Sequence, residues 1–193
     1  MKGASFEREV STKLSLWWSN QTRSDIFYRT PGSGGRFTNR RKSGKDTANH
    51  AGDQLASDPS GQPLMDCWSV ECKTGYGKKT DSGVNRWDIL DFLDSRQKEP
   101  ILQKMWAQCK RDAELSNKEP ILIFRRNNRA PCIMFRTSYM LHLQDFYGDY
   151  LDFHLFVRTT LNCVIIPLDS FFEWIPNIRA SLKPKKKQIK IRR

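Results

Sequence analysis

The chain has 193 residues, of which 38% are hydrophobic and 11% aromatic, so it is long and apolar enough to form one domain with a substantial core. Its formal net charge of +12 predicts a polyanionic partner, and nucleic acid is favoured over an acidic membrane surface. No segment approaches the roughly 20 apolar residues of a membrane span and the N-terminus lacks the apolar run of a secretory signal, so we expect no membrane contact and a cytoplasmic protein, associated with the nucleoid or, if viral, in the host cytoplasm.

The cysteines are odd in number and form no CxxC pair, which argues against a disulfide framework and against a zinc module. We therefore expect free, mostly buried thiols. The five positions are Cys67, Cys72, Cys109, Cys132 and Cys163.

The N-terminal segment predicts a helix followed by a short strand. Phe6, Val10 and Leu14 recur at helical spacing, so we expect a helix over residues 3–19. Residues 26–29 have strand composition and end at a glycine-rich run. The polar, strongly basic residues 36–52 are predicted to form a mobile surface loop.

The next segment reads as a hairpin, a loop and a helix. Residues 53–58 and 64–74 look like two strands, and residues 59–62 between them have the composition of a hairpin turn. A glycine- and lysine-rich loop over 75–85 follows. Apolar residues at helical spacing then predict a helix over 99–116.

Strand patterns dominate the rest of the chain. The apolar run at 120–124 predicts a buried strand, and a turn at Asn127-Asn128 leads to another strand at 132–135. The remaining expected elements are strands at 153–157 and 163–166 and a helix opening at 169–174. The order predicts an α/β fold with a mixed β-sheet flanked by helices.

We expect residues 1–182 to form a single domain, with a core over about 2–137 and a C-terminal elaboration over about 138–182. Residues 183–193 are too charged to pack and are predicted to be a disordered basic tail.

Residues 71–73 carry the strongest chemical signal. Side chains alternate along a strand, so Glu71 and Lys73 share one face while Cys72 lies on the apolar face. A carboxylate beside an ammonium group suits metal-assisted phosphodiester hydrolysis, but one carboxylate is too few to hold a cation. Asp53, 18 residues before Glu71 (71 − 53 = 18), is the preferred second carboxylate if it begins the other strand of the hairpin.

Other interpretations of these residues stay open. Asp58 and Asp66 are rival carboxylates, although the first suits a turn and the second has the opposite strand parity to Glu71. The Glu71–Lys73 pair alone is also explained by an exposed strand bearing an ordinary Glu–Lys contact.

Four segments together resemble the archaeal-type Holliday junction resolvases, which are small dimeric members of the PD-(D/E)XK nuclease superfamily. They occur in that family's order over about residues 2–125, and they are Lys2-Gly3-Ala4-Ser5-Phe6-Glu7-Arg8-Glu9, Gly32-Ser33-Gly34-Gly35, Asp53, and Glu71-Cys72-Lys73. The resemblance implies a restriction-endonuclease-like fold and a homodimer that cuts branched double-stranded DNA. It also implies a Mg²⁺ cofactor, for which Mn²⁺ substitutes, and paired nicks that leave 5′ phosphates.

The resemblance assigns roles to matching positions. The implied catalytic residues are Glu7, Ser33, Asp53, Glu71, Lys73 and Gln108. The implied metal-binding residues are Asp53, Glu71, Cys72 and Glu7. The resemblance implies that Arg8 binds DNA. The net charge and the nearby carboxylates favour contact with the DNA backbone by a further set, although a flexible turn and a solvated charged loop explain the same residues. This set is Arg29, Gly32, Gly34, Gly35, Arg36, Arg40, Arg41, Lys42 and Lys45.

The chain departs from the family pattern in places, and simpler explanations exist for some residues. Gly52 stands where many relatives have the proline of the PD motif, and the loop before it is long. Glu7 also suits the first turn of a helix, where a carboxylate stabilises the helix dipole. The alternative functions are another PD-(D/E)XK nuclease, of restriction or repair type, and a DNA-binding module that does not cut.

Overall fold

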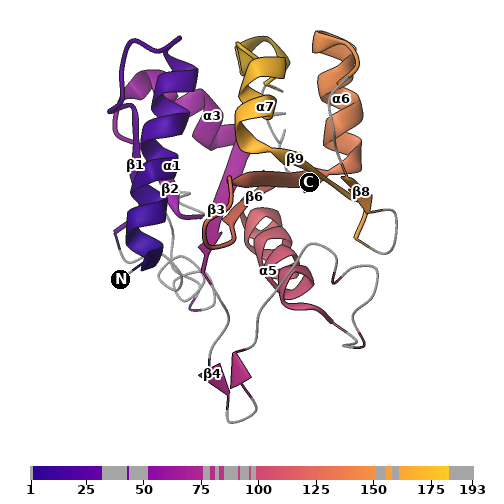
Figure 1. Ribbon diagram of the computed structural model, residues 1–193. Helices are drawn as coiled ribbons and strands as arrows, with labels where there is room; N and C mark the ends of the chain where they lie inside the picture. Colours follow the sequence, from indigo (N-terminus) through magenta and orange to yellow (C-terminus); the bar gives the residue numbers. More distant parts are fainter. Residues whose placement is uncertain are drawn as a thin grey trace.

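A five-stranded mixed sheet is the centre of the computed structural model (Figure 1). The structure describes residues 2–31, 43, 52–75, 79–80, 83–84, 91, 96, 99–150, 155–157 and 161–182. In chain order the elements are α1 (Lys2–Trp18), β1 (Phe27–Arg29), β2 (Gln54–Ala56), η1 (Pro59–Gly61), α3 (Gln62–Cys67), β3 (Trp68–Thr74), β4 (Lys79–Thr80), β5 (Gly83–Val84), α5 (Ile101–Ser116), β6 (Glu119–Arg125), β7 (Cys132–Arg136), α6 (Thr137–Tyr147), β8 (Leu155–Val157), β9 (Cys163–Pro167), α7 (Leu168–Trp174) and η2 (Ile178–Ser181).

The strand order of the central sheet is β3-β6-β7-β9-β8. β3 and β6 run parallel, and Glu71 lies opposite Leu122 in their register. The other neighbouring strands are antiparallel. Residues 120–124 of β6 are all buried, as expected of a strand covered on both faces. β3 is the outer strand next to it, and its free side is where the candidate site forms.

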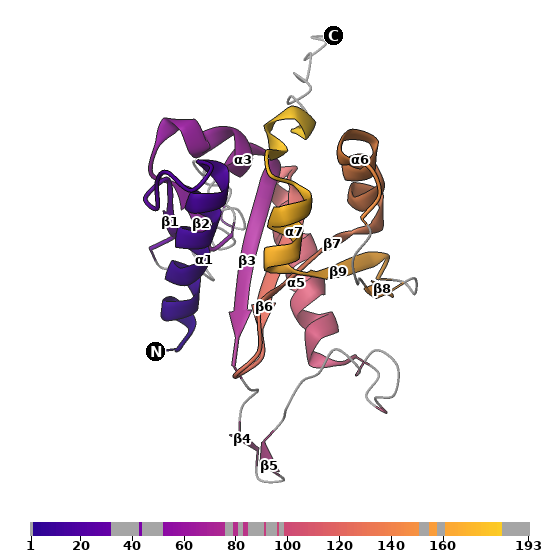
Figure 2. The ribbon, with the colours of Figure 1, turned by 45° about the horizontal axis from the view of Figure 1, so that its top comes forward.

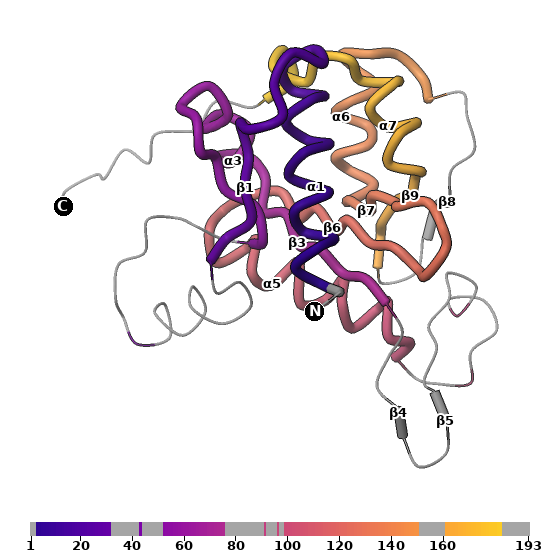
Figure 3. The backbone as a smooth tube through the Cα atoms, turned by 60° about the vertical axis from the view of Figure 1, so that its left-hand side comes forward, coloured from indigo at the N-terminus to yellow at the C-terminus, as the bar shows by residue number. Residues whose placement is uncertain are grey.

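Helices cover both faces of the sheet. On one face, α1, α6 and α7 pack against alternate residues of the strands, among them Trp68, Val70 and Ile121. On the other face, Leu102, Trp106 and other residues of α5 pack against a second apolar cluster. Figure 3 shows these layers, with α1, α6 and α7 on one side of the strands and α5 on the other. The fold class predicted from the sequence is confirmed.

A two-stranded sheet beside the central one carries the residues around Asp53. β1 pairs antiparallel with β2, so that Arg29 lies opposite Gln54, and β1 packs against α1. Just before β2, Gly52 forms an isolated parallel bridge with Val70 of the central sheet. Figure 2 shows β1 and β2 close to α1, to one side of β3.

The expected hairpin of residues 53–58 and 64–74 is wrong. The Asp58 side chain accepts a hydrogen bond from the Ser60 N–H at 2.8 Å and caps η1, which begins at Pro59. Residues 62–67 then form the short helix α3, which buries Leu64, and β3 begins only at Trp68. A capping aspartate before proline starts a helical turn more readily than a hairpin turn, and β2 finds its partner in β1 instead.

Other expected elements agree with the structure within a few residues. The predicted helices at 3–19 and 99–116 and the strands at 120–124, 132–135 and 163–166 are observed. Helix α6 was not predicted. Most of the two expected loops, 36–52 and 75–85, and the basic tail at 183–193 lie outside the described residues. Within the described part of the chain, no helix is long and apolar enough to cross a membrane.

Candidate active site

Two carboxylates meet where the chain crosses the open edge of β3. The Asp53 N–H donates to the Val70 carbonyl at 2.6 Å, next to the bridge formed by Gly52. The Cys72 N–H donates to Oδ2 of Asp53 at 2.9 Å. Asp53 and Glu71 are 4% and 5% exposed, so both carboxylates are removed from bulk water. The structure therefore brings the two together, by a parallel bridge rather than by the expected hairpin.

Burial, and then the negative charge of Asp53, raise the pKa of the Glu71 carboxyl to about 7. The neighbouring Lys73 opposes both effects. The pair thus concentrates negative charge in a place where water solvates it poorly.

Lys73 and Gln108 both contact Glu71. The Lys73 ammonium donates to Oε1 of Glu71 at 2.5 Å, which confirms that the two side chains share one face of β3. Burial lowers the Lys73 pKa, but the Glu71 carboxylate outweighs this and raises it overall, so the group is charged at neutral pH. Gln108, on α5, donates its amide to the same Glu71 oxygen at 3.3 Å. The α5 face of β3 therefore holds a carboxylate with two donors around it.

Cys72 contributes its main chain to the site rather than its thiol. The buried side chain lies on the α1 face of the sheet, where Gln54 donates to its Sγ at 3.6 Å. The two main-chain groups of one residue point to the same side of a strand. Since the Cys72 N–H points to Asp53, its carbonyl oxygen also faces the open edge. The carbonyl is therefore the atom through which the predicted metal role of Cys72 is feasible.

The donor set fits a hard divalent cation. Two carboxylates and a main-chain carbonyl offer oxygen ligands, and a cation such as Mg²⁺ keeps several waters as its remaining ligands. A cation would also offset the repulsion between Asp53 and Glu71. Among the residues that the structure describes, no group of three or more His, Cys, Asp or Glu side chains is placed to hold a metal, so the side-chain ligands would be these two.

Glu7 and Arg29, which the sequence assigned to the metal and to DNA, form an ion pair with each other. Nε of Arg29 lies 2.8 Å from Oε2 of Glu7. The Glu7 side chain, on α1, is 13% exposed. The predicted metal role of Glu7 stays a prediction.

The remaining predicted residues are mostly outside the described part of the chain. Arg8 is described and is exposed on α1. The others, whose roles stay predictions, are Gly32, Ser33, Gly34, Gly35, Arg36, Arg40, Arg41, Lys42 and Lys45.

Gln54 is a buried polar residue that no sequence pattern singles out. It is 1% exposed. Its Oε1 accepts from the Ser11 hydroxyl at 2.7 Å, and its Nε2 donates to the main-chain carbonyl of Glu7 at 2.9 Å. Through these bonds and its contact with Cys72, it links α1, β2 and β3 directly beside Asp53. No local pattern predicts such a link, because all its partners are distant in the sequence.

Gly52 has a conformation that proline cannot adopt. Its φ is +91°, whereas proline fixes φ near −65°. A Cβ at this position would lie 2.4 Å from the Val70 carbonyl oxygen, a distance that no side chain tolerates. The glycine that replaces the proline of the PD motif therefore allows the chain to approach β3 closely, with Asp53 one residue later.

Comparison with known proteins gave one family. The family model described as "Phage putative PDDEXK endonuclease" matches residues 1–174. No curated protein and no solved structure matches the chain significantly.

We predict that Gly52→Ala destabilises the protein by about 2 kcal/mol or more, because it adds a main-chain clash to an unfavourable φ. Gly75→Ala is the matched control, since Gly75 has a φ of +96° but a Cβ there would meet nothing within 4 Å. Urea unfolding measures both free energies. Equal losses in the two variants would contradict the close approach of residue 52 to β3.

We also predict a pH effect on the metal-free protein. The folded state raises the Glu71 pKa from 4.5 to about 7, so it retains a proton that the unfolded chain releases within this range. Stability should therefore fall as the pH rises from about 4.5 to about 7, by about 1–3 kcal/mol relative to Glu71→Gln. Unfolding in EDTA at several pH values gives this difference, and parallel curves for the two proteins would argue against it.

Proposed function

The chain belongs to the family of phage PDDEXK endonucleases, and from this premise we propose that it is a Mg²⁺-dependent enzyme that cuts branched double-stranded DNA. One observation carries the proposal: two buried carboxylates, Asp53 and Glu71, lie together at a strand edge with the Lys73 ammonium group alongside. The family indicates the type of reaction, which is cleavage by an endonuclease. PD-(D/E)XK nucleases generally use divalent metals. The choice of Mg²⁺ and of branched DNA is ours.

The carboxylates of Asp53 and Glu71 and the carbonyl oxygen of Cys72 would hold the cation. When bound, a divalent cation lowers the pKa of a coordinated water and neutralises charge on the scissile phosphate. Asp53 is held in place for this task by the Cys72 N–H, which donates to its Oδ2. Gln108, on α5, donates a hydrogen bond to Glu71 and so restrains its side chain.

Lys73 would act directly on the reacting phosphate. Its ammonium group is charged, partly buried and next to Glu71, so it can donate to an attacking water or to a phosphate oxygen that gains negative charge. Its position is restrained by Glu71 before substrate binds, and a group that is already in place need not be ordered at the moment of reaction.

Branched DNA and a homodimer are proposed on two grounds. The net charge of +12 supports binding to a polyanion. The Lys2–Glu9, Gly32–Gly35 and Glu71–Lys73 segments resemble those of dimeric Holliday junction resolvases. Two copies would place one active site on each of two opposed strands, so that a junction is cut symmetrically.

We predict that the protein cuts a labelled four-way junction in Mg²⁺ and that Glu71→Ala and Lys73→Met each lower the rate at least about 100-fold. The rate is measured by gel electrophoresis beside a linear duplex of the same sequence. Equal cutting of the two DNAs would overturn the preference for branches and leave the nuclease proposal intact. Equal rates for wild type and Glu71→Ala, or no cutting of either DNA, would refute the proposal.

A separate prediction concerns the metal alone. Mg²⁺ or Mn²⁺ should raise the melting temperature of the wild type, because it binds the folded state and offsets carboxylate repulsion. Asp53→Asn and Glu71→Gln should lose most of this increase. Lys73→Met, which keeps both carboxylates, should retain it. An equal increase in all four proteins would place the binding site of the cation elsewhere.

A further inference from the structure

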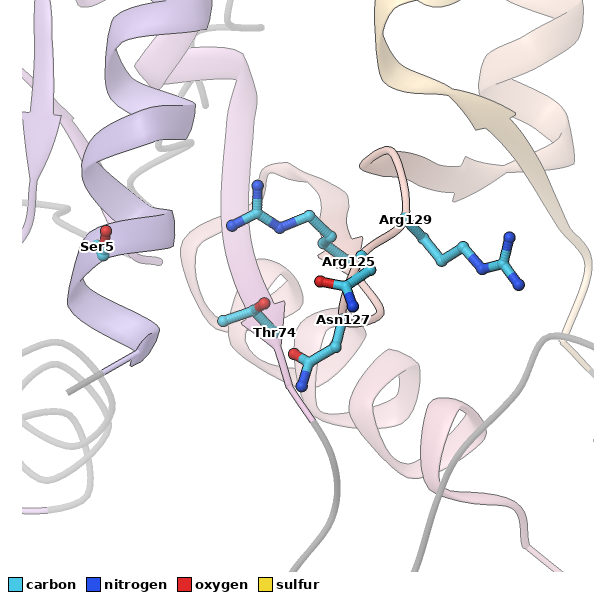
Figure 4. Close-up of a pocket in the computed structure, with 6 residues that line it drawn as sticks. Ser5, Thr74, Arg125, Asn127 and Arg129 are labelled. Carbon is cyan, nitrogen blue, oxygen red and sulfur yellow. The ribbon is translucent and has the colours of Figure 1, made fainter.

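A polar cleft lies at the carboxyl ends of β3 and β6, apart from the carboxylate pair. Its volume is about 430 Å³, and it spans the space between the first turns of α1 and the turn that joins β6 to β7 (Figure 4). The residues that line it are Ser5, Thr74, Arg125, Asn127, Asn128 and Arg129. None of them belongs to the proposed active site.

Arg125 forms a fixed wall of the cleft. Its Nη1 lies 2.8 and 2.7 Å from the two carboxylate oxygens of Glu9, and its guanidinium lies 4.6 Å from the centre of the Phe6 ring. Figure 4 shows the side chain of Arg125 extending across the end of β3 toward α1. These contacts join β6 to α1, so the cleft has a rigid shape.

The other lining side chains have polar groups that the fold does not use. In the part of the chain that the structure describes, no hydrogen bond or ion pair is made by the side chains of Ser5, Thr74, Asn127, Asn128 and Arg129. Two hydroxyls, two amides and a guanidinium are therefore available to a ligand from several directions. Such a set of donors suits the oxygens of a phosphate group.

The local charge also favours an anion. Arg125 is the last residue of β6, and Arg126 and Arg129 follow it in the turn to β7. Glu9 forms an ion pair with Arg125. Arg129 is exposed, and Figure 4 shows it on the far side of the turn from Arg125, so that it can meet a chain of phosphates that continues past the cleft.

The cleft lies close to the proposed active site along β3. Thr74 follows Lys73 in β3 and is three residues beyond Glu71, which corresponds to about 10 Å along the strand. For a duplex whose axis runs along β3, phosphates of one strand follow each other every ~3.4 Å, so this distance would correspond to about three nucleotides. A DNA strand whose scissile phosphate lies at Glu71 would thus present a neighbouring phosphate to the cleft.

We infer that this cleft binds the sugar-phosphate backbone of the DNA about three nucleotides from the cut. The inference rests on the proposed function, because the position of the cut is defined by Glu71. Ser5, Thr74 and Asn127 donate hydrogen bonds to phosphate oxygens, and Arg129 neutralises a charge. The cleft fixes the register of the strand over the carboxylates and does not read base sequence.

The double variant Asn127→Ala/Arg129→Gln tests the inference, since neither side chain supports the described fold. Asn128 is kept because its φ of 57° is needed by the turn. The matched control is Arg23→Gln, which removes an equal charge beyond the far end of α1, about 20 Å along the helix from Ser5. Its ion pairs with Asp25 and Asp58 are exposed and contribute little stability.

Binding of a fluorescent four-way junction and of a duplex is measured in EDTA over a range of salt concentrations. We expect the double variant to bind about 5- to 10-fold more weakly, with a salt slope smaller by about 1, while Arg23→Gln behaves as the wild type. An affinity and slope equal to those of the control would overturn the inference.

Uncharged methylphosphonates placed singly along the strand, on both sides of the mapped cut, locate the contact without changing the protein. We expect a substitution about three nucleotides from the cut to weaken wild-type binding and to have no further effect on the double variant. If every position weakens both proteins equally, the cleft does not contact the backbone. Wild type that neither binds nor cuts DNA would refute the proposed function instead, so the two failures are distinct.

Discussion

The main-chain contact between residues 52–53 and the edge of β3 is the interaction on which the site depends. It places the Asp53 N–H on the Val70 carbonyl and the Cys72 N–H on the Asp53 carboxylate. Both bonds use the free side of β3, which is available because β6 occupies only the other side. Without this contact, Asp53 would belong to a small sheet on α1 and Glu71 to the central sheet, with nothing to hold the two carboxylates together.

The free energy of the two carboxylates depends on their burial as much as on their charge. Isolated carboxylates in an apolar environment are expensive, and a protein keeps them only where a partner offsets the cost. Lys73 and Gln108 supply part of this on the α5 face, and Gln54 ties the surrounding main chain to α1. The fold thus holds a repulsive pair in place with contacts from both layers of helices, which is the condition for strong, selective binding of a cation.

The sequence predicted those features that depend on local periodicity. Alternation along β3 placed Glu71 and Lys73 on one face, and helical spacing predicted α1 and α5. It failed where pairing is non-local. The hairpin was wrong because β2 pairs with β1, about 25 residues earlier in the chain, and the loop between them hides this from any local pattern. The roles of Gly52 and Gln54 were not predicted, because they arise only from distant partners.

The middle residue of the Glu71-Cys72-Lys73 triplet serves two layers of the molecule at once. Its N–H donates to the Asp53 carboxylate, while its side chain fills the apolar layer beneath α1. Exchange for another small apolar residue would leave the chemistry untouched, whereas a charged or large one would push α1 away from the sheet and shift Asp53 with it. Sequence variation at this position among relatives should therefore follow the volume available under the first helix, and not the choice of metal or substrate.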